Sequence, residues 1–161
     1  MHVIIDGYNV IMTAAEYGAV SGRKMRAARS GLINDLIRYR KVRGHAVTVV
    51  FDAVKAGGVE RVVERSAGIN VIFTKGEERA DDVIVELVEK AAGVERVVVT
   101  SDREVVRASE RRGAASISSE SFIEKMSAAI GSGDGREVDD ERERGKTGRS
   151  RSRGETSLNK L

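Results

Sequence analysis

The apolar residues of this chain fall into short runs separated by longer segments with helical periodicity. Uninterrupted apolar runs are typical of strands buried on both faces of a parallel sheet, and they predict strands over residues 3–5, 46–51, 69–74, 95–100 and 114–117. Apolar residues at helical spacing predict helices over 22–42, 80–92, 103–112 and from Ser119 or Glu120 to about 130. The alternation predicts a three-layer α/β/α fold, with a central, mostly parallel sheet of about five strands.

Two segments fit no single prediction. Residues 10–20 are mostly small and apolar, and indicate either a loop or a short helix that crosses the sheet. Residues 55–68 contain Gly57-Gly58 and then valines among charged residues, a pattern that fits either a short hairpin or an irregular loop. In both cases we expect the arginines of this second segment to overhang the carboxyl ends of the strands.

Composition bounds the class of protein. A length of 161 residues predicts one domain with a core of moderate size. The absence of cysteine excludes disulfides and thiolate metal sites, and fits a reducing cytoplasm. No apolar stretch approaches the roughly 20 residues that span a bilayer, and no signal peptide precedes the first strand, so we expect a cytoplasmic protein that binds no membrane. A net charge of +3 and a pI near 9.3 permit an anionic partner without requiring one.

The composition changes at Gly131. Residues 131–161 contain almost no apolar side chains, and from Arg142 onward they carry seven basic residues against two acidic ones. We therefore predict a folded domain over residues 1–130 and a basic tail over 131–161 that is disordered on its own. The run Arg149-Ser150-Arg151-Ser152-Arg153 could bind nucleic acid and fold on contact, or it could stay solvated.

Aspartates follow four of the predicted strands. Asp6, Asp52 and Asp102 stand at strand ends or just after them, and Asp81-Asp82 open the helix that follows the third strand. Parallel strands end along one edge of a sheet, so we expect these carboxylates to gather there. A single aspartate in such a position is more often a helix cap or a turn residue. Four strand ends of the same kind favour a shared acidic site.

Gathered carboxylates raise each other's pKa values unless a positive charge lies among them. Mg²⁺ is the simplest compensation, because it prefers carboxylate and amide oxygens and keeps several waters. Such a cation can activate water and stabilise charge on phosphoryl oxygens, as in a metal-dependent phosphodiesterase. On a helical wheel Asp81 lies beside the buried face while Asp82 points nearly opposite, so Asp81 is the expected ligand and Asp82 could act through water. Asn9 could orient Asp6 or a water, or form a turn.

Other chemistries have less support. His2 and His45 stand at the starts of their predicted strands, at the opposite ends from the carboxylates. No serine has a nucleophile-elbow context, and glycine-rich phosphate loops of the P-loop or dinucleotide type are missing. Phosphoryl transfer through an aspartyl phosphate needs an acid two residues after the nucleophile, and Tyr8 occupies that place after Asp6.

The stretch Ile4-Ile5-Asp6-Gly7-Tyr8-Asn9-Val10-Ile11 resembles the opening motif of NYN domains, a nuclease branch related to PIN domains. Together with Val50-Phe51-Asp52, residues 73–82 and Thr100-Ser101-Asp102, it is similar to the YacP-like bacterial group, which includes a ribosome-associated endoribonuclease. The resemblance covers about residues 2–130. It implies a PIN-like α/β/α fold, Mg²⁺ or Mn²⁺ as cofactor, and RNA cleavage. The chain departs from some relatives at Val106, where they carry a further acidic residue, so a second metal ion is not implied.

By match of motif, the resemblance assigns catalysis to Asp6, Asn9, Asp81, Asp82 and Asp102, and we expect Asp6, Asp81 and Asp102 to hold the metal. It also implies docking on the ribosome and cleavage of messenger RNA during translation. Cleavage by activated water would leave a 5′ phosphate and a 3′ hydroxyl. The alternative is a non-catalytic RNA-binding or ribosome-binding module that retains a degenerate acidic pocket.

Several residues have the chemistry to hold RNA near the acidic edge. Tyr8 could stack on a base, and six basic side chains could bind phosphates: Lys55, Arg61, Arg65, Lys75, Arg79 and Arg103. A second basic group, Arg23, Arg38 and Lys41, falls on the outer face of the predicted helix 22–42 and could follow a phosphate backbone. Each of these side chains could equally be a solvated surface residue.

Overall fold

The computed structural model describes residues 1–14, 23–52, 60–134 and 157–161. Its strands are β1 (His2–Asp6), β2 (Ala46–Phe51), β3 (Val62–Ser66), β4 (Ile69–Phe73), β5 (Arg96–Val99) and β6 (Ala115–Ile117). Its helices are α1 (Gly7–Thr13), α2 (Arg23–Arg43), α3 (Ala80–Lys90), α4 (Arg103–Glu110), α5 (Ser119–Asp134) and the short 3₁₀ helix η3 (Ser157–Lys160). None of the helices in these ranges is long and apolar enough to cross a membrane.

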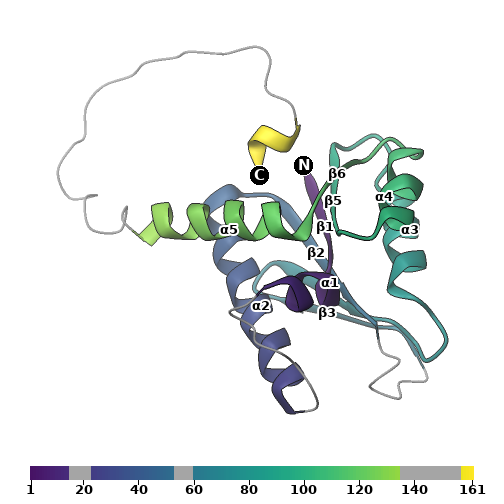
Figure 1. Cartoon of the computed structure of the whole chain (residues 1–161), viewed down its shortest axis with the longest axis horizontal. Coiled ribbons are helices and arrows are strands. Elements are labelled where there is room, and N and C mark those ends of the chain that lie inside the picture. The colour runs from purple at the N-terminus through teal and green to yellow at the C-terminus, as the bar shows by residue number, and fades with distance from the viewer. Residues whose placement is uncertain (15–22, 53–59, 135–156) are drawn as a thin grey trace.

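The strands form one sheet in the order β3-β4-β2-β1-β5-β6, with helices on both faces (Figure 1). Neighbouring strands are parallel except for β3 and β4, which form an antiparallel hairpin. The chain first builds the sheet on one side of β1 and then crosses over to build the other side with β5. Ligands of α/β sheets bind outside the carboxyl ends of the strands at such a reversal of strand order. The expected three-layer fold is therefore confirmed, and its topology marks the edge between β1 and β5.

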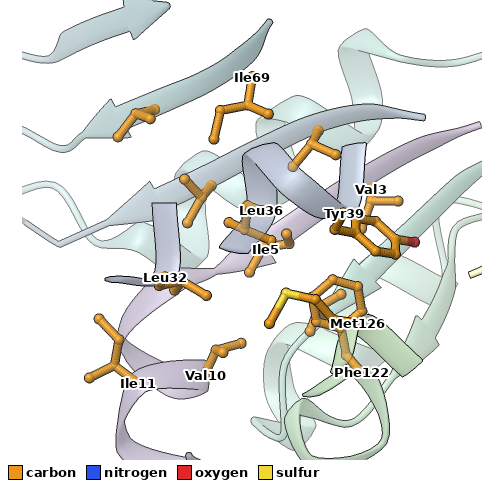
Figure 2. Close-up of a cluster of buried hydrophobic side chains, with 14 of the residues drawn as sticks. Val3, Ile5, Val10, Ile11, Leu32, Leu36, Tyr39, Ile69, Phe122 and Met126 are labelled. Carbon is orange, nitrogen blue, oxygen red and sulfur yellow. The ribbon is translucent and has the colours of Figure 1, made fainter. Parts of the chain in front are cut away.

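Alternate residues of the central strands face different helical layers. Val3 and Ile5 of β1 point into the larger core cluster, where Figure 2 shows side chains of α2 and α5 packed together: Leu32, Leu36, Tyr39, Phe122 and Met126. Ile4 points to the other face, into the cluster that α3 and α4 cover. The apolar run at the start of the chain is continuous because both of its faces are buried.

The segment that the sequence left open forms the β3–β4 hairpin, which adds a sixth strand to the five that we expected. Its turn consists of Ala67 and Gly68, whose φ angles are +44° and +88°. A two-residue hairpin turn whose central residues both have positive φ matches the right-handed twist of the strands. The other open segment begins as helix α1, and its remainder from residue 15 lies outside the described residues.

The predicted C-terminal tail has structure at both of its described ends. Helix α5 continues to Asp134, past the boundary that we placed at residue 130. At the other end Leu161 is 2% exposed within the larger core cluster, and the His45 ring donates a hydrogen bond to the Lys160 carbonyl at 2.7 Å. The structure therefore differs from the expected disorder at these two ends. Residues 135–156 lie outside the described part, and the division of the chain at residue 130 stays a prediction.

Candidate active site

Three carboxylates gather at the edge where the strand order reverses. Asp6 is the last residue of β1, Asp102 follows β5, and Asp81 lies in the first turn of α3. Beyond the effect of burial, the charges of Asp81 and Asp102 both raise the pKa of Asp6, and Asp102 raises that of Asp81. The structure thus brings together the three residues that the sequence offered as metal ligands.

Asp6 is fixed by hydrogen bonds to both of its oxygens. Its Oδ1 accepts one from the backbone N–H of Asn9 at 3.3 Å, which makes Asp6 the N-cap of α1. Its Oδ2 accepts another from the Thr100 hydroxyl at 3.1 Å. The pKa of Asp6 is nevertheless raised to about 6, chiefly by burial, while the two hydrogen bonds oppose the rise. The ionised carboxylate is therefore unfavourable unless a positive charge compensates it.

Thr100 links two of the carboxyl-bearing segments. Its side chain is 1% exposed, and its hydroxyl accepts a hydrogen bond from the backbone N–H of Asp102 at 3.2 Å while it donates to Asp6. Asp102 in turn caps α4, because its Oδ1 accepts from the backbone N–H of Glu104 at 2.8 Å and of Val105 at 3.3 Å. Asp102 is therefore a helix cap as well as a member of the acidic group.

Asp81 and Asp82 differ in exposure as the helical wheel predicted. Asp82 is exposed, whereas the side chain of Asp81 is 27% exposed and its Oδ2 accepts from Arg79 at 2.5 Å. Burial raises the pKa of Asp81, Arg79 opposes the rise, and the carboxylates of Asp102, Asp82 and Asp52 add to it. Asp52, at the end of β2, therefore contributes to the same negative field.

Asn9 contacts Asp6, as one of our expectations had it, and has a further role that we did not expect. Its backbone binds Asp6, but its side-chain oxygen accepts from the Ser101 backbone N–H at 2.9 Å and from the Ser119 hydroxyl at 2.5 Å. Ser119 is fully buried at the start of α5, and its backbone N–H donates to the Ser101 hydroxyl at 3.1 Å. Asn9 thereby ties α1 to the loop after β5 and to α5. Sequence reasoning missed the roles of Thr100 and Ser119, although a hydroxyl at the end of the apolar run 97–99 was an available signal.

Gly7 allows the chain to turn from β1 into α1 against the core. A Cβ at this position would lie 2.3 Å from the Phe51 ring, closer than any real contact. Phe51 is fully buried and stacks on Phe73 with ring centroids 5.6 Å apart. The glycine between Asp6 and Tyr8 is therefore required by a close approach.

The family model described as the YacP-like NYN domain matches residues 3–161. The chain belongs to this family. It is similar to the uncharacterized protein YacP of Bacillus subtilis (strain 168), with 34% identity over 85 residues, which are 53% of this chain and 49% of that protein. The match thus spans about half the length of this curated relative.

Solved structures of the same kind support the fold of this YacP-like NYN domain. A crystal structure of a mutant of Rae1 (YacP) from Bacillus subtilis has a TM-score of 0.73 and 26% identity, with 87% of this chain and 84% of that chain covered. A second crystal structure of Rae1 (YacP) has a TM-score of 0.70 and 25% identity, with 86% and 79% covered. These likenesses confirm the α/β NYN fold, and the family is nuclease-like.

Three of the predicted RNA-binding side chains of this NYN domain are exposed at the acidic edge. Lys75 follows β4, Arg79 precedes α3, and Arg103 is the first residue of α4. Arg79 is 65% exposed even though it pairs with Asp81. Lys55 lies outside the described residues.

Arg61 lies at the expected edge but is paired within the fold, whereas Arg65 lies elsewhere. The Arg61 guanidinium pairs with Glu78 and also with Glu86 at 2.8 Å, and these hydrogen bonds raise its pKa further above the usual range. It therefore connects the hairpin to α3. Arg65 is exposed on β3 opposite Asn70, toward the amino-terminal end of β4. The expectation that Arg65 overhangs the carboxyl edge is wrong, because the antiparallel register carries it away from that edge.

Tyr8 already has partners within the fold. Its ring makes an edge contact with Phe51 at a centroid distance of 5.3 Å, and its hydroxyl accepts from Arg29 at 3.1 Å. It is partly buried against the larger core cluster. Stacking of a base on Tyr8 stays a prediction, and it would use the part of the ring that remains accessible.

The donor set of the YacP-like site suits a hard cation. Asp6, Asp81 and Asp102 offer only carboxylate oxygens, and the pKa values of Asp6 and Asp81 are raised first by burial and further by the neighbouring carboxylates. Within the described residues, no group of three or more His, Cys, Asp or Glu side chains is placed so that it could hold a metal ion by itself. A loose carboxylate group fits Mg²⁺ better than a cation that needs a full protein cage, because Mg²⁺ keeps several waters and uses only one or two carboxylates.

Proposed function

We propose that this protein is a metal-dependent endoribonuclease that cleaves messenger RNA in association with the ribosome. The observation that carries the proposal is the gathering of Asp6, Asp81 and Asp102 where the strand order reverses, with the pKa of Asp6 raised to about 6, chiefly by burial. Membership of a nuclease-like family supports the reaction class. The association with the ribosome and the choice of messenger RNA as substrate are inferred from the resemblance to the YacP-like group.

The three carboxylates would hold Mg²⁺ or Mn²⁺, with Asp82 reaching the site through water. When bound, such a cation lowers the pKa of a coordinated water and neutralises charge on the phosphoryl oxygens. The protein contributes a fixed arrangement of charge, because Thr100 holds Asp6 and the Asp102 backbone, and Asn9 holds the loop before Asp102. A site that keeps its geometry needs little reorganisation during reaction.

Basic side chains around the site would bind the RNA backbone. Lys75, Arg79 and Arg103 are exposed next to the carboxylates, and phosphate contacts position nucleic acid without reading its sequence. Arg79 lies 2.5 Å from Asp81, so it can exchange a carboxylate for a phosphate oxygen when RNA enters. Lys55 and Tyr8 complete the proposed contacts.

The test compares wild type with Asp6→Asn on a 5′-labelled messenger RNA, naked and ribosome-bound, with Mg²⁺ or with EDTA. We expect Mg²⁺-dependent cleavage that leaves 5′ phosphate and 3′ hydroxyl ends, and a loss of at least about a hundredfold in Asp6→Asn. Cleavage by both proteins at the same rate, or 2′,3′-cyclic phosphate ends, would contradict the mechanism. Stronger cleavage of ribosome-bound than of naked RNA is the expected sign of ribosome association.

A non-catalytic RNA-binding or ribosome-binding module is the second candidate. It is favoured by the pairing of Asp81 with Arg79 and by the lack of a close-knit metal site in the described residues. The same assay separates the two candidates. Tight RNA binding by both proteins, without cleavage by either in Mg²⁺, would favour the binding module.

A further inference from the structure

Helix α2 is strongly basic on its outer face. Its sequence carries eight basic residues and one acidic residue, Asp35. The buried face consists of Met25, Ala28, Leu32, Leu36 and Tyr39, which pack into the larger core cluster. Apart from Arg43 at the C-terminal end of the helix, the exposed charged side chains lie on the outer side and are all basic: Lys24, Arg26, Arg38 and Lys41. We call these four residues the basic stripe.

Little within the described residues neutralises the stripe. Arg38 has Asp35 at 3.9 Å, and within the described ranges no carboxylate lies within ion-pair distance of Lys24, Arg26 or Lys41. The other exposed side chains that the structure describes on this face are uncharged: Ala27, Ser30 and Asn34. A basic surface with few acidic neighbours favours a polyanionic partner, because each phosphate contact releases condensed counterions.

The stripe begins at the acidic edge and runs away from it. Arg29, in the first half of α2, donates to the Tyr8 hydroxyl and lies 5.5 Å from the centroid of the Phe73 ring, at the carboxyl ends of β1 and β4. The other end of α2 leads through Gly44 to the start of β2 at the opposite edge. Figure 1 shows the first turns of α2 extending past α1. A helix of this length spans roughly 30 Å.

The stripe also borders a groove. The space between α2 and α5 has a volume of about 760 Å³, and Lys24 and Arg38 line it together with Asp35, Met126 and Ile130. Two of the four stripe cations therefore stand beside a hollow surface that can admit part of a partner.

We propose that the basic stripe is a docking surface for the phosphate backbone of double-helical RNA, separate from the site that cleaves. The inference rests on the proposed function for its choice of RNA over other polyanions. Among the described residues of α2 no aromatic side chain is exposed, whereas surfaces for single strands stack bases on aromatic rings. Cations spaced along the outer half of a long helix can instead contact backbone phosphates of a rigid duplex, which proteins recognise by shape and backbone. A duplex held there would place an adjoining single strand near the acidic edge.

The test measures binding of a labelled RNA duplex of about 20 base pairs at several salt concentrations. The variant Arg26→Gln with Lys41→Gln removes one charge from each half of the stripe. The control, Arg107→Gln with Arg111→Gln, removes the same charge from exposed residues of α4 and its C-terminal cap on the other face. We expect the stripe variant to bind about tenfold more weakly or worse at 0.1 M salt, with the salt slope reduced by nearly 2. The control should bind within about twofold of wild type.

Further arms decide the partner and separate this inference from the proposed function. Duplex binding by the stripe variant equal to that of wild type would overturn the proposal. The proposal would also be overturned if the stripe variant lost as much affinity for unstructured single-stranded RNA as for the RNA duplex. An equal loss of affinity for duplex DNA would overturn it too, because the surface would then bind any polyanion. Cleavage of a short unstructured RNA should be unchanged in the stripe variant. If wild type cleaves nothing but the stripe variant loses duplex binding, the docking surface stands and the nuclease proposal fails.

Discussion

The Thr100 hydroxyl donates a hydrogen bond to Oδ2 of Asp6 at 3.1 Å, although 94 positions separate the two residues in the chain. Strand pairing makes this contact possible, because Ile5 of β1 lies opposite Val99 of β5 and the next residues are Asp6 and Thr100. The same hydroxyl accepts from the backbone of Asp102. The geometry of the acidic site is therefore fixed by the register of the sheet, and a slip of one residue would turn these side chains to the wrong face.

Asp6→Asn should stabilise the protein at alkaline pH when divalent cations are absent. The pKa of Asp6 rises from 3.8 to about 6 on folding, chiefly because of burial, so the folded state binds this proton more tightly than the unfolded chain does. Stability from this group therefore falls as the pH rises from about 4 to 6, and stays low above that window. The full shift corresponds to roughly 3 kcal/mol. We expect a gain of about 1 to 2 kcal/mol, because an amide caps α1 well but meets the Thr100 hydroxyl less favourably.

Urea unfolding in EDTA at pH 8 and at pH 4 measures this effect. The gain should be present at pH 8 and much smaller at pH 4, where the wild-type carboxyl is protonated in the folded state and roughly half protonated in the unfolded chain. The exposed Asp82→Asn is the matched control and should change stability by less than about 0.5 kcal/mol. A wild type that is as stable as Asp6→Asn at pH 8 would show that Asp6 carries no unfavourable charge.

Ser119→Ala should loosen the contact between α1 and α5. It removes the hydroxyl that donates to Asn9 at 2.5 Å in a fully buried place, and we expect a loss of about 1 to 2 kcal/mol of unfolding free energy. RNA cleavage should also slow, through kcat more than KM, because Asn9 holds the loop before Asp102. The control is Ser132→Ala on the same helix, whose exposed hydroxyl donates only to its own helical turn. If the two substitutions changed the unfolding free energy and the cleavage rate equally, Ser119 would have no positioning role.

Gly7→Ala should destabilise the protein through the Phe51 ring. The added methyl group would lie 2.3 Å from that ring, and overpacking of this kind costs about 1 to 3 kcal/mol. A double-mutant cycle with Phe51→Leu, followed by chemical unfolding, measures the clash directly. In the Phe51→Leu background the cost of Gly7→Ala should fall to less than half. The same cost in both backgrounds would mean that another contact requires the glycine.

Arg61→Gln should affect stability more than RNA binding. Its guanidinium contacts Glu78 and Glu86, and partly exposed ion pairs of this kind contribute about 1 kcal/mol. The loss should be smaller in a Glu78→Gln, Glu86→Gln background. RNA affinity should change less than in Arg103→Gln, which removes an exposed cation beside Asp102. A larger loss of RNA affinity in Arg61→Gln than in Arg103→Gln would contradict this prediction and show that Arg61 binds RNA.

The central strands were predictable because both of their faces are buried. Residues 46–51 were expected as a strand and form β2 with the same limits, and helix α2 begins and ends one residue from its expected bounds. Strand β3 gave no such signal. Val62 and Val63 are 44% and 62% exposed on this edge strand, so no alternation of buried and exposed positions distinguished a hairpin from a loop. The burial of Leu161 in the core was missed for a related reason, because a single apolar residue in a polar segment forms no periodic pattern.

The sequence predicted which carboxylates form the acidic site, but it did not predict the hydrogen bonds that fix their positions. Strand ends of a parallel sheet must meet at one edge, so the placement of Asp6 and Asp102 followed from the strand pattern alone. The contacts of Thr100 with Asp6 and of Ser119 with Asn9 join residues 94 and 110 positions apart. Local patterns cannot encode such contacts, because they depend on strand register and on the docking of α5.

A crystal soaked with Mn²⁺ tests most directly whether the aspartates form one cation site. The anomalous difference map should contain a peak among the carboxylates of Asp6, Asp81 and Asp102, either bound directly or through water, and the peak should be lost in Asp6→Asn. A saturated crystal with no peak at these three residues, or with the same peak in Asp6→Asn, would contradict the account.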